Sequence, residues 1–167
     1  MTTMTGRFGA TLACLVFLSL AGGPALAQSS NSIPSKALVG TWRVTITTFN
    51  CTTQAQIATF PSLLVFHDDG TMLEETSSLQ FAAGQRTNGH GYWERMNRGS
   101  YRAVFEAFIQ FDTAGPPPLK RGRQRVDQQI VMSSRDAFTS DASVTFFDPA
   151  GTVLLNGCAR ASGVRFE

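Results

Sequence analysis

The sequence predicts an all-β protein, an eight-stranded antiparallel up-and-down barrel with one disulfide. Three features predict it. Apolar and polar residues alternate with a period of two along most of the chain, as in half-buried strands. Turns rich in Gly, Asp and Pro interrupt this alternation at regular intervals. Cys51 and Cys158 lie near the first and the last predicted strands, so a bond between them would make those strands neighbours.

Residues 1–27 have the three parts of a signal peptide. Arg7 precedes an apolar run over residues 8–21, and Ala25-Leu26-Ala27 places small residues at −3 and −1. The run is shorter than the roughly 20 apolar residues that a transmembrane helix needs. We therefore expect cleavage before Gln28, no transmembrane anchor, and a periplasmic or secreted bacterial protein. In such an oxidising compartment, two thiols form a disulfide.

The mature chain is predicted to be one barrel domain, residues 38–167, after a flexible polar leader, residues 28–37. The alternation predicts strands over residues 39–48, 62–67, 71–77, 90–95, 100–111, 122–132, 137–147 and 152–165. The fifth is the clearest, because bulky and small apolar residues share one face of it: Tyr101, Ala103, Phe105, Ala107, Ile109 and Phe111.

The predicted connections differ in length. Those after the second, fourth and sixth strands are short: Asp68–Gly70, Met96–Gly99 and Ser133–Asp136. Those after the first, third and fifth are long: Phe49–Pro61, Ser78–Gly89 and Asp112–Arg121. In an up-and-down meander the two groups lie at opposite ends. One end should therefore be closed by tight turns and the other ringed by longer loops, as in a barrel with a mouth.

A Cys51–Cys158 bond across an antiparallel pair also predicts a register. It places Val44 opposite Arg165 and Ile46 opposite Gly163, all on the inward face. The alternation and the disulfide then agree, which supports closure between the first and last strands.

Charge and motifs exclude several classes of function. The formal net charge of +2 argues against a dedicated nucleic-acid binder. His67 and His90 belong to no metal-binding or nucleophile motif, so we assign no catalytic residue, no metal ligand and no cofactor. Glu74 and Glu75 are adjacent in a strand and point to opposite faces; one is expected inside, with Arg165 as a candidate partner.

Gly40-Thr41-Trp42 opens the first strand, and a basic residue, Arg165 or Arg160, lies on the last. With eight strands in meander order, the chain resembles the calycin superfamily, the lipocalins and their relatives. It is also similar to uncharacterised exported bacterial β-barrel proteins, with allene-oxide-cyclase-like barrels as an alternative relative. The calycin resemblance implies that Trp42 and Arg165 pack together at the closed end in a structural role.

Small residues on the inward face of the last strand leave room inside the barrel: Gly157, Ala159, Ala161 and Gly163. Either aromatic side chains from the opposite walls fill that room or a cavity remains. The residues expected to contact a small apolar or amphipathic ligand are Trp93, Tyr101, Phe105, Gln128 and Phe138. The basic run Lys120–Arg125 either attracts an anionic group at the mouth or forms a solvated outer face.

Three functions follow from this barrel. The first is an exported module that binds a small molecule. The second is an isomerase- or cyclase-type enzyme that positions a reactive hydrophobic substrate, in which case His90 or Glu75 would be needed for activity. The third is a packed, ligandless barrel that acts as an interaction protein.

Overall fold

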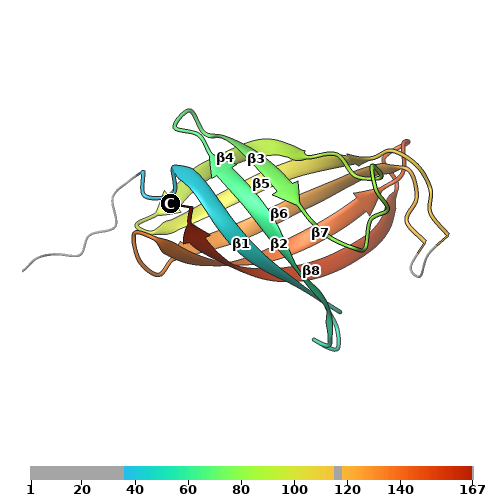
Figure 1. Ribbon diagram of the computed structural model, residues 1–167, viewed down its shortest axis with the longest axis horizontal. Helices are drawn as coiled ribbons and strands as arrows, with labels where there is room; N and C mark the ends of the chain where they lie inside the picture. The colour runs from blue at the N-terminus through green and yellow to red at the C-terminus, as the bar shows by residue number, and fades with distance from the viewer. Residues whose placement is uncertain (1–35, 115–117, 167) are drawn as a thin grey trace, which may run out of the picture. The chain divides into compact units, whose positions relative to one another are not determined.

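The computed structural model describes residues 36–114 and 118–166, and these residues form a closed barrel of eight antiparallel strands (Figure 1). Each strand pairs with the next in sequence, and the last pairs with the first. The strands are β1 (Gly40–Phe49), β2 (Gln56–Phe66), β3 (Thr71–Thr76), β4 (Gly89–Asn97), β5 (Ser100–Ile109), β6 (Gly122–Met132), β7 (Ala137–Phe147) and β8 (Val153–Arg165). The predicted fold class is confirmed. The predicted signal peptide, residues 1–27, and most of the predicted leader lie outside the described residues.

Strand β2 begins earlier than predicted. The expected long loop Phe49–Pro61 is wrong: β2 starts at Gln56, and only residues 50–55 connect it to β1. Pro61, taken as the end of that loop, pairs with Thr45 of β1 within the strand. The ladder with β3 ends at Ser62, and just beyond it the Pro61 carbonyl accepts a hydrogen bond from the Ser77 N–H (3.1 Å). Proline has no N–H to donate to a ladder, so it is tolerated in strands at such ladder ends.

The disulfide joins Cys51 to Cys158, as predicted, with Cα atoms 5.3 Å apart. The register inferred from it is displaced by two residues. Arg165 pairs with Trp42, and Gly163 pairs with Val44. The displacement arises because Cys51 lies beyond the end of β1, in the turn that leads to β2, while Cys158 pairs with Phe49. A shift of two residues keeps every side chain on its predicted face.

The inward face of β5 is buried from Tyr101 to Ile109 in the predicted alternation. The strand ends at Ile109, two residues earlier than predicted, and Phe111 is 42% exposed in the following connection. Gln110 there donates its backbone N–H to the carbonyl of Gln85, so this segment joins the preceding long loop instead of extending the sheet.

One end of the barrel, which we call the closed end, is packed with side chains. Its connections are short: residues 67–70, 98–99 and 133–136. Leu38 and Trp42 are fully buried there, and the Trp42 indole donates a hydrogen bond to the Leu38 carbonyl (2.8 Å). Ala37, assigned to the leader by its sequence, is also buried in this core. The segment before β1 therefore helps to fill the closed end.

The opposite end, which we call the mouth, carries the longer connections. They are residues 50–55, 77–88, 110–121 and 148–152. Figure 1 shows these loops at the end of the barrel opposite to the start of β1 and the end of β8. The predicted division into a tightly turned end and a loop-rich end is thus present, although the first connection is shorter than expected.

Candidate functional site

A cavity of about 380 Å³ occupies the half of the barrel next to the mouth. Apolar side chains from strands on all sides form most of its wall, among them Val44, Ile46, Leu64, Phe105, Val126, Val144 and Phe146. Ile57 and Leu155, which are 59% and 41% exposed, lie where the cavity opens. The cavity is therefore a mostly apolar chamber, and the mouth loops also supply polar residues to its lining, among them Asn50, Thr52 and Gln80.

The small residues of β8 explain why only half of the barrel is hollow. At Gly163, near the closed end, an added Cβ would overlap the ring of Phe138, so this glycine makes room for an aromatic side chain. At Gly157, near the mouth, the nearest atom to an added Cβ is the Val144 Cβ at 3.8 Å. Gly157 and Ala159 both line the cavity. Both of the expected outcomes occur: aromatics fill the barrel at one end, and space remains at the other.

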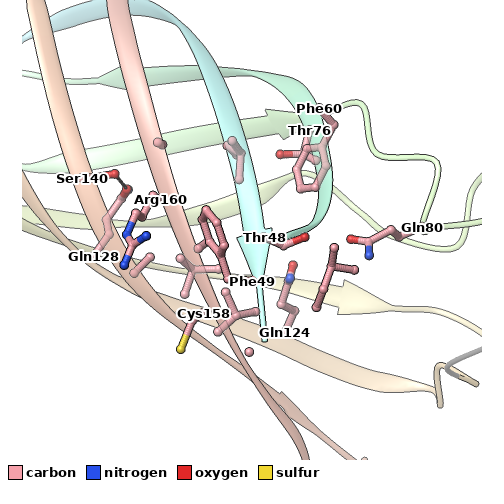
Figure 2. A pocket seen from close by; sticks show the side chains of 18 of the residues that line it. Thr48, Phe49, Phe60, Thr76, Gln80, Gln124, Gln128, Ser140, Cys158 and Arg160 are labelled. Atoms are coloured by element: carbon pink, nitrogen blue, oxygen red, sulfur yellow. Dashed lines mark hydrogen bonds between the residues drawn. The ribbon is translucent and has the colours of Figure 1, made fainter. Parts of the chain in front are cut away.

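Two inward polar side chains, Gln128 of β6 and Ser140 of β7, lie on one wall of the cavity (Figure 2). They are 4% and 5% exposed, and the Ser140 hydroxyl donates to Gln128 Oε1 (3.3 Å). The Gln128 Nε2 atom has no hydrogen-bond partner among residues 36–114 and 118–166. Most buried polar atoms in proteins have a partner, so an unpaired amide nitrogen in a side chain that lines a cavity calls for one.

A buried ion pair also lines the cavity, and it reaches from β3 to Gln124 of β6. Glu74 of β3 is 2% exposed, and its carboxylate contacts Arg86 Nη2 (2.8 Å). Its other oxygen accepts a hydrogen bond from Thr76. Arg86 also donates from Nε to Gln124 Oε1 (2.6 Å) and from Nη1 to the Thr87 carbonyl (3.2 Å). Each nitrogen of the guanidinium is thus engaged, and the two charges neutralise each other.

Arg86 reaches this position because the β3–β4 connection folds against the barrel. β3 has only six residues, and residues 77–88 supply Gln80, Phe81 and Arg86 to the cavity wall beyond its end. Gln85 anchors the loop: it is fully buried, and its Nε2 donates to the Phe111 carbonyl and to Thr113 Oγ1 (both 3.1 Å). The loop is therefore part of the cavity wall.

The five residues predicted to contact a ligand are divided between the two halves of the barrel. Phe105 and Gln128 line the cavity. Trp93, Tyr101 and Phe138 lie towards the closed end. The Trp93 ring contacts those of Tyr101 (5.6 Å between centroids) and Phe66, and Phe138 packs on Trp42 (5.0 Å). All five side chains point into the barrel, as alternation predicted. They differ in how far along the barrel they lie, so only two of them reach the cavity.

Arg86 and Gln124 were not predicted as part of the site, and Arg165, the candidate partner for whichever of Glu74 and Glu75 is inward, is not that partner. Alternation showed that one of Glu74 and Glu75 is inward; it is Glu74, and Glu75 is exposed. Arg165 lies at the closed end, so it does not pair with Glu74. Arg86 lies in a loop, where no periodicity indicates the direction of a side chain. An inward carboxylate is nevertheless costly unless it is paired or hydrogen-bonded, which is a signal to look for a partner.

The charged side chains outside the cavity mostly pair with one another. Arg102 donates to both oxygens of Asp127, from Nε to Oδ1 (3.0 Å) and from Nη2 to Oδ2 (2.5 Å). These hydrogen bonds lower the pKa of Asp127 below its ordinary value. In the basic run, Lys120 pairs with Asp112, and both Arg123 and Arg125 pair with Glu106. This pairing supports the interpretation of the run as a solvated outer face.

The two histidines do not belong to the cavity. His67 and His90 are exposed, and neither is among the lining residues. No group of three or more His, Cys, Asp or Glu side chains within the described residues is arranged to hold a metal ion. In the same part of the chain, no helix has the length and apolar character needed to cross a membrane.

Comparisons with known proteins add little to this geometry. No protein-family model matches the sequence, and no curated protein sequence matches it. Among solved structures, the chain is similar to a protein of unknown function from the DUF3598 family of Nostoc punctiforme, with a TM-score of 0.38 and 9% identity. The match covers 81% of this chain and 50% of that one, so this chain spans about half of its length. At that distance the likeness carries no argument about function.

Proposed function

We propose that this chain is an exported, calycin-like module that binds a small apolar or amphipathic molecule inside the barrel. The observation that carries the proposal is the apolar cavity of about 380 Å³ that opens between the mouth loops. Ligand pockets in proteins are concave, mostly apolar and roughly 300–1,000 Å³ in volume, with a few placed polar groups. This cavity has those properties.

The rest of the barrel supports the same function. The packed closed end gives the cavity a rigid floor, and the disulfide ties the 50–55 turn to β8 beside the entrance. Export is supported by the predicted signal peptide, residues 1–27, and by the disulfide, which is compatible with an oxidising compartment. The calycin-like relationship is supported by the meander order and by the guanidinium of Arg165, which lies 4.4 Å from the centroid of the Trp42 ring.

Fluorescence titration with N-phenyl-1-naphthylamine, an uncharged apolar probe, tests ligand binding. We expect saturable binding by the wild-type protein and loss of binding in Ala159→Phe, because Ala159 lines the cavity. Ser162→Phe is the matched control, since Ser162 is exposed on the same strand and outside the cavity lining. It should bind the probe as the wild type does.

The melting temperature of the same variants completes the experiment. If the cavity exists in solution, Ala159→Phe fills empty space and keeps its melting temperature. If the interior is packed, the extra volume destabilises the fold by about 1–3 kcal/mol. A destabilised Ala159→Phe variant, together with a wild type that does not bind the probe, contradicts the proposal. The remaining hypothesis is then a packed, ligandless barrel that acts as an interaction protein. Export is tested separately by intact mass spectrometry. The mass should be that of a chain that starts at Gln28, and treatment with an alkylating reagent should not change it unless the disulfide is first reduced.

A further inference from the structure

We infer that the ligand of this cavity carries an uncharged oxygen acceptor, such as a ketone, ester or ether oxygen, that receives a hydrogen bond from Gln128 Nε2. This inference rests on the proposed function and specifies the chemical class of the ligand. The observation behind it is the amide nitrogen of a side chain that lines the cavity; this nitrogen is buried and has no hydrogen-bond partner among the described residues.

The position of the Gln128 side chain is set from its other end. The Ser140 hydroxyl on the neighbouring strand donates to Oε1, as the dashed line in Figure 2 shows. On the inward face, Gln128 pairs across the sheet with Ala142 and Ala103, whose methyl groups offer no acceptor. The amide N–H groups are therefore left for a molecule inside the cavity. A buried donor without a partner destabilises the protein, and a suitable ligand oxygen would remove that cost.

The charges around the cavity argue against an ionised ligand group. A carboxylate would need an available cation, but each nitrogen of Arg86 is already hydrogen-bonded to Glu74, Gln124 or Thr87. Arg160, the other basic residue in the lining, has a side chain 58% exposed and pairs with Asp141 and Gln54. An ammonium group would meet the same neutralised Glu74. Burial of an uncompensated charge is far more costly than burial of a neutral acceptor.

The apolar lining of the cavity, which includes Phe105, sets the chemistry of the rest of the ligand. Apart from the Gln128–Ser140 pair and the group around Glu74 and Arg86, much of the cavity surface is formed by apolar side chains such as Val44, Ile46 and Val144. A ligand that places its acceptor at Gln128 would leave its remaining surface against these groups. The ligand class is therefore a neutral amphiphile with one deep polar oxygen and an apolar remainder.

Three naphthalene probes of one skeleton test this class by displacement of N-phenyl-1-naphthylamine. 2-Acetylnaphthalene carries the acceptor, 2-ethylnaphthalene replaces it with an apolar group of similar shape, and 2-naphthoate carries a carboxylate. The measured quantity is the affinity of the ketone relative to the ethyl compound. Gln128→Leu should lower this ratio about fivefold, the value of one neutral hydrogen bond. Gln129→Leu, the same change on the exposed neighbouring residue, should leave it unchanged.

In the wild type, 2-naphthoate should compete at least about tenfold more weakly than 2-acetylnaphthalene, because its charge would be buried without a partner. Gln128→Leu should also be as stable as the wild type or more so, because it removes an unpaired buried polar group. A ketone-to-ethyl ratio that is the same in Gln128→Leu, or tighter binding of the carboxylate, overturns the inference while probe binding itself still supports the proposed function. Failure of the wild type to bind N-phenyl-1-naphthylamine defeats the proposed function instead.

A measurement on the wild type keeps the inference testable if Gln128→Leu does not fold. The side-chain amide protons of Gln128 should shift downfield in NMR spectra on addition of 2-acetylnaphthalene, and should not do so with 2-ethylnaphthalene. Equal responses to both probes would show that the amide is not the donor, and would overturn the inference.

Discussion

The guanidinium of Arg165 lies over the indole ring of Trp42, 4.4 Å from its centroid. The two residues are paired across the β1–β8 seam that closes the barrel. Arg165 also donates to the carbonyls of Val39 (3.0 Å) and Ala37 (2.7 Å) and to the carboxylate of Asp136 (3.0 Å). One side chain thus joins the segment before β1, the last strand and the β6–β7 turn.

Trp42→Ala should therefore destabilise the fold by about 3–5 kcal/mol, the usual cost of removing a buried aromatic side chain. Trp42 is fully buried and contacts Phe138. Urea denaturation measures the change, and probe binding below the transition should persist because Trp42 is outside the cavity lining. An unchanged midpoint of unfolding would show that this contact does not support the closed end.

Two glycines on one strand should respond oppositely to the same substitution. Gly163→Ala should lose about 1–3 kcal/mol of stability, because the added methyl overlaps the Phe138 ring. Gly157→Ala should be neutral or gain up to about 1 kcal/mol, because its methyl enters the cavity and a strand alanine has less backbone freedom to lose. Thermal unfolding of both variants measures the difference. Equal losses would mean that the mouth half is packed in solution.

Asp127 should contribute to stability in a pH-dependent way. Hydrogen bonds from Arg102 hold its folded-state pKa below the ordinary value of 3.8. The contribution is therefore fully present above that value and is lost as the pH falls through the lowered folded-state pKa. Asp127→Asn should cost about 0.5–1 kcal/mol at about pH 7, the range of a partly exposed ion pair, and less at about pH 2.5.

A double-mutant cycle with Arg102→Gln isolates this pair, because Arg102 also lies near Glu94 (3.7 Å). The coupling free energy, from urea denaturation at several pH values, should shrink on acidification. A coupling that is constant down to about pH 2.5 would mean that the carboxylate of Asp127 is not its source.

Sequence alternation predicted the eight strands and the direction of their side chains, although β2 begins earlier than predicted. A strand has a period of two, so the polarity of neighbouring residues suffices to show which face is inside. Gln128, Phe105, Trp93 and Trp42 were all placed inside the barrel for this reason. The loop lengths likewise indicated which end is open, since alternate connections of a meander lie at the same end. The predicted mature chain has only two cysteines, so only one disulfide pairing was possible.

Only the tertiary structure decided what depends on depth and on irregular backbone. Alternation does not show how far along the barrel a side chain lies, so Phe138 and Gln128 looked equivalent although one is packed and the other faces the cavity. The true β1–β8 register depended on where β1 ends relative to Cys51. Arg86 could be identified as a site residue only from the structure, because residues 77–88 fold against the barrel and bring it to Glu74. Loops have no period, so the contacts they make follow from packing in three dimensions.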